Sequence, residues 1–583
     1  MDELFFCFEK EIKMRKYFVL FLIVILAVFL RFYQLGQNPP SISWDEAAWG
    51  YNAYSLGIDG RDEFGRFLPH DYLESFGDFK PPVYAYLDIM PVKIFGLNEF
   101  AVRFPSAILG SLTVLITYFL VLEIFSNRKW EIGSAKLDKE VGNRKEKSHF
   151  SPQISVSHLS LLTSFLLAIS PWHINLSRAA FEANVATFFI VCGVWLFLAA
   201  VHNKKWLIVF SAISFVLSMY TFNTSRIVSP LLVLMLAIGF RKKLLEIKRE
   251  TILAMIVGIL LILPTFKFLI SPQASLRFKE VNIFTDGSIV GTSNTEITND
   301  QNVWWSKVIH NRRFLFAKEY LRHYFDNLNP NFLFIRGDGN PKFSTRDVGE
   351  LYLLEVPFLV GGLLFIFKKK WGDWWLVPLW LVVGIIPAAT ARETPHALRI
   401  ETILPTFQIL TAVGLVFLFE KIKDLENLSR YLKKLIFFLF ALFLTFNFLY
   451  YFHGYYAHYP REYSGEWQYG YKDSISYVQS VENNYDQINI TDSLGRPYIY
   501  YLFYTKTDPK EFQKTANITR EAFGFVTVNA FDKYRFAKDI RTIDNKGKRV
   551  LYINNFFQIP NDAKILKTFY LLNGSPILAA YTI

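Results

Sequence analysis

Cysteine is scarce in this chain, and so is charge. Only two cysteines occur among 583 residues, Cys7 and Cys192, which excludes a disulfide framework and a metal site built from cysteine. Asp, Glu, Lys and Arg make up 20% of the residues, below the ~25% of an ordinary soluble domain. Hydrophobic residues reach 52% and aromatic residues 17%. This balance is typical of a polytopic membrane protein. The net charge of +12 requires no nucleic-acid partner, and we expect none, because basic cytoplasmic loops account for it.

Long apolar runs recur along the chain. A transmembrane helix needs about 20 apolar residues to cross roughly 30 Å of hydrocarbon. The first run resembles a signal peptide, but no small-residue cleavage site follows it, so we expect an uncleaved anchor. We predict about eleven transmembrane helices, at 16–34, 101–125, 157–172, 184–202, 206–222, 227–240, 251–270, 351–367, 374–390, 402–419 and 435–452.

Lysine and arginine gather in every second loop between these runs. With eleven spans, all basic loops fall on one side, which the positive-inside rule marks as cytoplasmic. We therefore expect a multi-pass protein of the plasma membrane, with residues 1–15 cytoplasmic and the C-terminus extracytoplasmic. The basic segments are 1–15, 127–156, 204–205, 241–249, 368–370 and 421–434.

The segments assigned to the outer side are the long ones. They are 31–100, 271–350 and 453–583, whereas residues 16–452 form the membrane part. Transporters and channels usually keep their loops short. Nearly half of the chain outside the membrane instead indicates chemistry at the outer face, in contact with membrane lipids.

The last external segment has its own pattern. Residues 474–486 are typical of a helix, and 487–492, 548–554 and 576–583 are typical of short strands. Helices that alternate with strands predict a small α/β domain over 453–583. We interpret it as a cap or acceptor platform without chemistry of its own, because it holds no nucleotide-binding motif.

The first external segment carries two adjacent acids, Asp45 and Glu46. Ser43 suits the N-cap of a helix, and Glu46 at the third helical position would complete a capping box. A purely structural role for the two acids and a catalytic one are both open on spacing alone. Lys80 stands before two prolines on a stiff, extended backbone. It could hold a phosphate or extend to lipid headgroups.

Taken together, these residues resemble a family. An acidic pair after the first span, a K-P-P motif at residues 80–82 and V-R-x-P-S at 102–106 resemble the GT-C membrane glycosyltransferases, and glycosyltransferase family 39 most closely. That family includes the protein O-mannosyltransferases and is related to the aminoarabinose transferases of lipid A. The resemblance covers about residues 15–450 and implies a GT-C transmembrane glycosyltransferase domain over 16–452. It implies a polyprenyl-phosphate sugar as donor and a reaction at the non-cytoplasmic face.

The resemblance also implies roles for single residues. Asp45 and Glu46 match the catalytic acidic pair, and Lys80 matches a lysine of the aminoarabinose branch. The glutamate that precedes this lysine in that branch, where it is associated with a metal, is Phe79 here. A divalent metal is therefore not required, although one could bind, and no other cofactor is expected.

Charged residues near other outer span ends complete the predicted site. Arg178, Arg226 and Arg399, with Lys80, could form a cationic pocket for the donor phosphate, because cations at these positions need an anionic partner. Arg178 and Glu182 are four residues apart and could instead pair on one helical face. A second acidic or substrate site is expected at Glu182, His173 and His396.

The sequence thus predicts an inverting glycosyltransferase for a hexose or pentose. Asp45 would act as the base that activates a lipid, glycan or protein acceptor. A retaining enzyme would need a second carboxylate about 5–5.5 Å away. A polymerase or ligase of lipid-linked glycans, and a polysaccharide or lipid transporter, are the alternatives.

Overall fold

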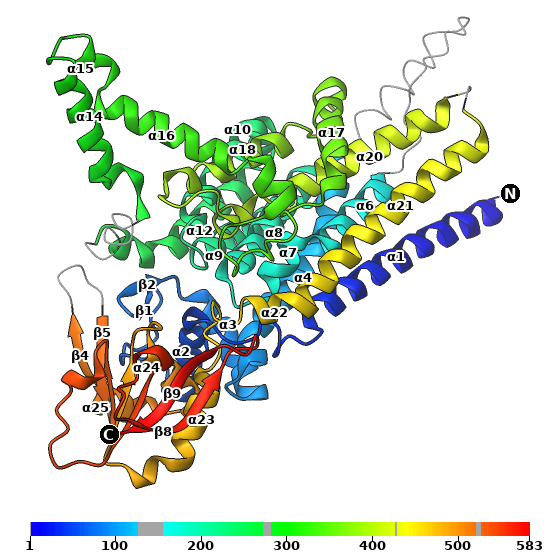
Figure 1. The fold of residues 1–583 in the computed structure, drawn as a ribbon. Coiled ribbons are helices and arrows are strands. Elements are labelled where there is room, and N and C mark those ends of the chain that lie inside the picture. Colours follow the sequence, from blue (N-terminus) through cyan, green and yellow to red (C-terminus); the bar gives the residue numbers. More distant parts are fainter. Residues whose placement is uncertain (1, 126–155, 272–273, 275–280, 426–427, 521–525) are drawn as a thin grey trace, which may run out of the picture.

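The structure is a computed structural model that describes residues 2–125, 156–271, 274, 281–425, 428–520 and 526–583. It consists of a helical bundle and a mixed α/β unit formed by the C-terminal part of the chain. Figure 1 shows this unit against one end of the bundle, while the N-terminus lies at the other end.

A helix forms over each of the eleven predicted apolar runs. These helices are α1 (Asp2–Phe32), α4 (Glu99–Ile124), α6 (Val156–Ile169), α8 (Glu182–His202), α9 (Leu207–Met219), α10 (Ser225–Gly239), α12 (Lys248–Leu269), α17 (Val356–Lys369), α18 (Leu376–Ile385), α20 (Thr406–Asp424) and α21 (Arg430–His453).

Not all of these helices are long enough to cross a membrane alone. Among the described residues, four helices pass a test of length and hydropathy, and six do so if each of two bent pairs counts as one span. The bends measure 56° between α6 and α7 (Pro171–Arg178) and 59° between Ala397–Ile403 and Thr406–Ile422. A polytopic helical architecture is therefore observed, whereas the number of eleven spans stays a prediction.

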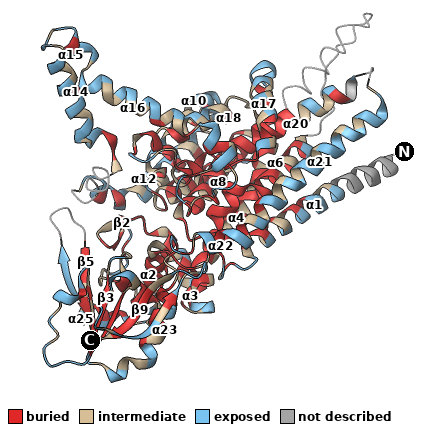
Figure 2. Ribbon diagram, viewed as in Figure 1, coloured by how far each residue is buried: buried red, intermediate tan, exposed pale blue. Residues whose placement is uncertain are grey.

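The outer helices expose apolar side chains. Only 17% of the apolar window of α12 and 6% of that of α21 is buried within the molecule. Figure 2 shows exposed residues along α1 and α21 and buried ones along α4 and α8. An apolar, outward-facing helix surface suits lipid, because its own hydrogen bonds satisfy the helix backbone.

Short helices and strands lie between the long helices, many of them within the predicted external segments. The first segment holds α2 (Trp44–Asp59), β1 (Leu73–Ser75), β2 (Asp78–Lys80) and α3 (Val83–Phe95). The others are α11 (Arg241–Glu246), η1 (Ile283–Thr285), α14 (Gly287–Asn299), α15 (Ser306–Ile309), α16 (Arg312–Asp326), η2 (Asn331–Arg336), η3 (Leu353–Glu355), η4 (Ala388–Thr390), α19 (Ala397–Ile400), η5 (Glu401–Ile403), η6 (Gly454–His458) and α22 (Tyr459–Glu462).

The C-terminal unit contains a seven-stranded sheet in the order β4-β5-β6-β3-β7-β9-β8. Strand β3 lies parallel to both of its neighbours, β6 and β7, and the remaining pairs are antiparallel. The elements are α23 (Tyr471–Val481), η7 (Glu482–Asn484), β3 (Gln487–Thr491), α24 (Pro497–Thr505), α25 (Pro509–Thr515), β4 (Asn517–Arg520), β5 (Val526–Phe531), β6 (Tyr534–Ala537), η8 (Ile540–Thr542), β7 (Val550–Asn555), η9 (Phe556–Gln558), β8 (Lys564–Tyr570) and β9 (Pro576–Thr582). The predicted helix and three predicted strands coincide with α23, β3, β7 and β9.

The C-terminal unit and the first external segment share one hydrophobic core. Trp49 and Tyr84, from α2 and α3, belong to the same buried cluster as Ile499 and Phe503 of α24. At the edge of this cluster, the Lys472 ammonium lies 2.8 Å from the carboxylate of Glu99, at the start of α4. The C-terminal unit is therefore packed directly against the first external segment and the start of α4.

Two glycines allow α17 and α20 to approach each other closely. A Cβ atom at Gly362 would overlap the carbonyl oxygen of Leu410, and one at Gly414 would overlap that of Phe358. Such backbone contact is the usual way in which membrane helices pack tightly.

We predict that Gly362→Ala and Gly414→Ala each destabilise the protein by about 1–3 kcal/mol, the common cost of overpacking. Thermal unfolding in detergent would show this as a lower midpoint. Gly361→Ala is the matched control, because a Cβ there meets nothing within 4 Å. Equal midpoints for all three variants would show that the two helices do not touch at these glycines.

Candidate active site

Helix α2 begins at the site with a complete capping box. The Ser43 hydroxyl accepts a hydrogen bond from the backbone N–H of Glu46, and the Glu46 carboxylate accepts one from the N–H of Ser43. Gly60, in the left-handed conformation, ends the helix. The structural interpretation of Glu46 as a capping residue is therefore confirmed.

Glu46 also forms a fully buried ion pair with Arg103 of α4. The Arg103 Nε lies 2.8 Å from Glu46 Oε1, and both side chains are 0% exposed. Oε1 also accepts a bond from the N–H of Ala180, in the turn between α7 and α8. The remaining donors of Arg103 bind the carbonyl oxygens of Leu35, Pro39 and Ser41.

This arrangement corrects the assignment of Glu46 to the catalytic pair. Both carboxylate oxygens are occupied by protein donors, and no part of the side chain reaches solvent. Glu46 therefore holds α2, α4 and the start of α8 together and does not meet a substrate.

Asp45, the adjacent acid, points elsewhere. Its side chain is 47% exposed and forms an ion pair with Lys80, which is only 8% exposed. Burial acts to raise the pKa of the Asp45 carboxyl, but the ammonium of Lys80, with Lys342 and Arg496, outweighs this and lowers the pKa below the usual range. One acid thus meets solvent while its neighbour is sealed in the core.

A β-hairpin delivers Lys80 to Asp45. Strands β1 and β2 pair in antiparallel register, with Leu73 opposite Lys80 and a two-residue turn at Phe76-Gly77. Both turn residues have positive φ, 58° and 80°, which is the hairpin turn that matches strand twist. The Lys80 Nζ lies 5.1 Å from the ring centres of Trp49 and Phe76.

Two further cations approach Asp45 from distant parts of the chain. The Lys342 Nζ lies 4.3 Å from the ring centre of Trp44, and the Arg496 guanidinium carbon lies 5.9 Å from the same ring. Lys342 follows η2 in the second external segment, and Arg496 precedes α24 in the C-terminal unit. Sequence reasoning missed both residues, because nothing local distinguishes them from other surface cations.

Glu182 is brought to the same place. It is the first residue of α8, and its carboxylate interacts electrostatically with Lys80, Asp45 and Asp78. The predicted pairing of Glu182 with Arg178 on one helical face is wrong, because α7 ends at Arg178 and the chain is extended at Ala179.

Arg178 does not belong to a phosphate pocket, which corrects that prediction. Its guanidinium is 0% exposed and donates to the carbonyl oxygens of Leu30, Tyr33 and Asn38 and to the hydroxyl of Tyr455. Arg178 therefore ties the end of α1 to the bundle.

His173 is likewise structural rather than part of a substrate site. Its Nδ1 lies 2.5 Å from the Arg31 Nη2, and both side chains are fully buried. Arg31 also donates to three backbone carbonyls, of Ala27, Leu167 and Ala168. A histidine that accepts a hydrogen bond from a buried guanidinium stays neutral and cannot serve as a free base.

Arg226 and Arg399 remain predictions as phosphate-binding residues. The Arg226 guanidinium carbon lies 5.4 Å from the ring centre of Phe268, and its Nη2 is buried without a hydrogen-bond partner in the described part of the chain. Phe268 in turn contacts Phe79, the neighbour of Lys80. Arg399 donates to the carbonyl oxygen of Glu393.

His396 lies in the same late loop as Arg399. Its ring packs 4.8 Å from that of Phe343, and its Nδ1 is 3.8 Å from Asp338 Oδ2. Burial, together with the charge of Arg399, holds the pKa of His396 well below the usual range. A neutral imidazole packed against Phe343 could contact a substrate, and this role stays a prediction.

Among the residues that the structure describes, no three His, Cys, Asp or Glu side chains form a group that could hold a metal ion. Phe79, which replaces the expected glutamate, packs against Tyr72 at a ring distance of 5.1 Å. We therefore derive no step through a metal.

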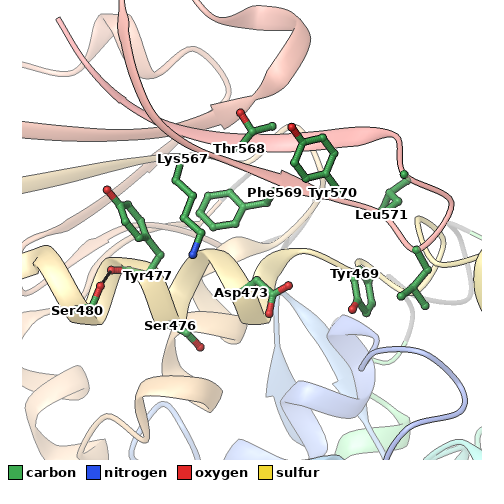
Figure 3. A pocket seen from close by; sticks show the side chains of 12 residues that line it. Tyr469, Asp473, Ser476, Tyr477, Ser480, Lys567, Thr568, Phe569, Tyr570 and Leu571 are labelled. Carbon is green, nitrogen blue, oxygen red and sulfur yellow. Dashed lines mark hydrogen bonds between the residues drawn. The ribbon is translucent and has the colours of Figure 1, made fainter.

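A surface groove lies apart from these residues. A groove of about 580 Å³ runs between α23 and β8 in the C-terminal unit. Figure 3 shows Asp473 and Tyr477 on the helix side, facing Lys567 and Phe569 on the strand. The Lys567 Nζ lies 5.2 Å from the ring centre of Tyr477 and partly covers it. Neither Asp45 nor Lys80 lines this groove.

This chain is similar in sequence and in fold to known proteins. The sequence profile of the dolichyl-phosphate-mannose-protein mannosyltransferases matches residues 21–134, which include Asp45, Lys80 and Arg103. An uncharacterized protein of Aquifex aeolicus is 33% identical over 117 residues, or 20% of this chain. The chain thus spans 21% of the length of the curated relative that it matches.

The whole fold is similar to that of a solved enzyme, ArnT from Cupriavidus metallidurans. The match covers 96% of this chain and 97% of ArnT at 12% identity, with a TM-score of 0.50, in both the apo state and the state bound to undecaprenyl phosphate. This chain has the fold of that enzyme. The resemblance inferred from the residues is supported by the family profile over residues 21–134 and by this fold. The oligosaccharyltransferase of Archaeoglobus fulgidus is matched over 84% of this chain and 63% of its own length, at 14% identity and a TM-score of 0.48.

We predict that the two adjacent acids contribute very differently to stability. Glu46→Gln leaves Arg103 as an unpaired buried charge, and breaking such a pair typically costs about 3–5 kcal/mol. Asp45→Asn should leave stability within about 0.5 kcal/mol, because the side chain is half exposed.

Thermal unfolding of the two variants in detergent measures the difference. Arg103→Lys should resemble Glu46→Gln, since an ammonium cannot replace the fork of five donors. Equal stability of the Glu46 and Asp45 variants would contradict the structural role of Glu46.

Proposed function

We propose that this chain is an inverting glycosyltransferase. It moves a sugar from a polyprenyl-phosphate donor to a lipid, glycan or protein acceptor at the outer face of the plasma membrane. The single observation that carries the proposal is the half-exposed Asp45, paired with Lys80 and surrounded by cations from three external segments.

Asp45 acts as the general base. The acceptor hydroxyl or amine gives its proton to the Asp45 carboxylate while its oxygen or nitrogen attacks the anomeric carbon. The bond between that carbon and the phosphate oxygen breaks, and its electrons stay with the leaving polyprenyl phosphate. With one base and in-line attack, the configuration at the anomeric carbon inverts. General bases typically contribute about 10²–10⁴-fold.

Lys80 couples donor binding to the strength of this base. While Lys80 pairs with Asp45, the pKa of the carboxyl is lowered and Asp45 holds a proton weakly. A donor phosphate competes for the ammonium of Lys80, because charge-assisted bonds to phosphate are strong. Asp45 then loses its partner and becomes a stronger base, so that activation of the acceptor follows the arrival of the donor.

The donor lipid and the sidedness come from the comparisons and the charge pattern. ArnT was solved with undecaprenyl phosphate, and an archaeal oligosaccharyltransferase was solved with dolichol phosphate. The Asp45 site lies at the end of the bundle that carries the C-terminal unit. The basic loops favour a cytoplasmic location for the opposite end, which supports an extracytoplasmic site.

A transporter is not favoured, because both the family profile and the overall fold match transferases. A polymerase or ligase that moves lipid-linked glycans would use the same donor chemistry at the same residues. The acceptor distinguishes it from a transferase of single sugars.

We predict that Asp45→Asn lowers kcat for sugar transfer at least 10²-fold, because it removes the base and keeps the shape. Transfer of radiolabelled sugar from a polyprenyl-phosphate donor, assayed with the purified variant, measures this. Asp473→Asn is the matched control, since Asp473 lies in the α23–β8 groove. Turnover within threefold of the parent would leave the enzyme without its base.

We predict a second, pH-dependent effect for Lys80→Gln. Lys80 holds the pKa of Asp45 down, and burial alone would raise it. The acid limb of kcat/KM, where protonation of Asp45 abolishes activity, should therefore move to higher pH in this variant. A pH–rate profile of both proteins tests it. An acid limb at unchanged pH would show that Lys80 does not control Asp45.

A further inference from the structure

We propose that the C-terminal unit completes the active site by supplying Arg496, which binds the phosphate of the lipid donor together with Lys342 and Lys80. The proposal rests on the function proposed above. It gives the C-terminal unit a direct role in substrate binding, in place of a role as a cap.

The position of Arg496 in the fold points to a ligand. It lies in the loop between β3 and α24, at the carboxyl end of a strand with parallel neighbours on both sides. α/β units commonly bind ligands at this end of the sheet. The preceding residue, Gly495, packs against the ring of Trp44, so that the loop reaches the first turn of α2.

The backbone at Arg496 is strained. Its φ and ψ are 45° and 49°, a left-handed conformation that costs energy for a residue with a Cβ and that glycine adopts freely. Such strain persists where surrounding structure imposes it and is found at functional sites. An arginine therefore occupies a backbone position that glycine would occupy without strain.

The side chain of Arg496 is held in place but makes no polar contact. Its guanidinium carbon lies 4.2 Å from the ring centre of Phe76, which the Lys80 ammonium also approaches, at 5.1 Å. Trp44 is similarly shared by Arg496 and Lys342. Within the described residues, neither Arg496 nor Lys342 forms a side-chain hydrogen bond or ion pair with the protein.

Two aromatic rings thus bring together three cations from three external segments, beside a single half-exposed carboxylate. A guanidinium that stacks on a ring keeps its five edge donors available, and these match a phosphate bidentately. A polyprenyl phosphate is the anion that the proposed reaction releases. As the bond between sugar and phosphate breaks, negative charge grows on the phosphate, and Arg496 stabilises it most at that stage.

Binding to the full-length purified protein tests this inference without turnover. The probe is farnesyl phosphate, a short prenyl phosphate, titrated in detergent by calorimetry, with farnesol as the uncharged comparison. We expect Arg496→Gln to weaken farnesyl phosphate binding at least tenfold and to leave farnesol unaffected. Arg496→Lys should also bind weakly. Arg541→Gln, an exposed arginine paired with Asp539 in the same unit, is the control and should bind like the parent.

Arg496→Gly separates a binding role from a structural one. Glycine relieves the left-handed strain, so the thermal midpoint should stay the same or rise while farnesyl phosphate affinity falls. A lower midpoint with unchanged affinity would make Arg496 a packing residue and overturn the inference.

Kinetics distinguish failure of this inference from failure of the proposed function. If the parent transfers sugar and Arg496→Gln retains its kcat and its KM for donor, Arg496 is outside the site. If the parent transfers no sugar but still binds farnesyl phosphate through Arg496, the anion site stands and the proposed reaction does not.

Discussion

The buried ion pair between Arg103 and Glu46 is the contact on which the site depends. It joins the first turn of α2, the first turns of α4, the loop after α1 and the start of α8, and every donor of the guanidinium is used. A carboxylate with no exposure is retained only with such compensation. Because Glu46 is fixed, the preceding residue of the helix, Asp45, is held at the surface, where it pairs with Lys80.

The site is built from segments that are far apart in sequence and share one apolar core. The hairpin that bears Lys80, the helix that bears Asp45 and the loop that bears Arg496 all rest on the cluster around Trp49, Tyr84 and Phe503. The shared core therefore fixes the relative positions of these charges, and only Lys80 and Asp45 among them are joined by an ion pair within the described residues. This preorganisation is what electrostatic stabilisation of a leaving phosphate requires.

Local sequence pattern and family resemblance predicted part of this arrangement. The capping box at Ser43 and the helices over each apolar run follow from short-range signals, whereas the roles of Asp45 and Lys80 were predicted from the family resemblance. Four strands of the C-terminal sheet, β4, β5, β6 and β8, were missed. Strands β4 and β8 lie at the edges with mostly exposed residues, which leaves no alternation of polar and apolar positions. Strands β5 and β6 do alternate in burial, so a signal for them was available. Arg178 was misassigned because its partners are mainly backbone carbonyl groups, and His173 because its partner is a buried arginine. No sequence signal marks such contacts. Lys342 and Arg496 could not be found, since their proximity to Asp45 exists only in the folded chain.

The shared core also has a consequence for biogenesis. Helices α2 and α3 are among the first parts to leave the ribosome, whereas α24 and the sheet that cover them are made last. Until the final hundred or so residues are translocated, the apolar faces around Trp49 stay uncovered and Arg496 is missing from the site. On the function proposed above, a truncated or still-emerging polypeptide therefore lacks Arg496 and leaves this core uncovered, so that donor binding would require the completed chain.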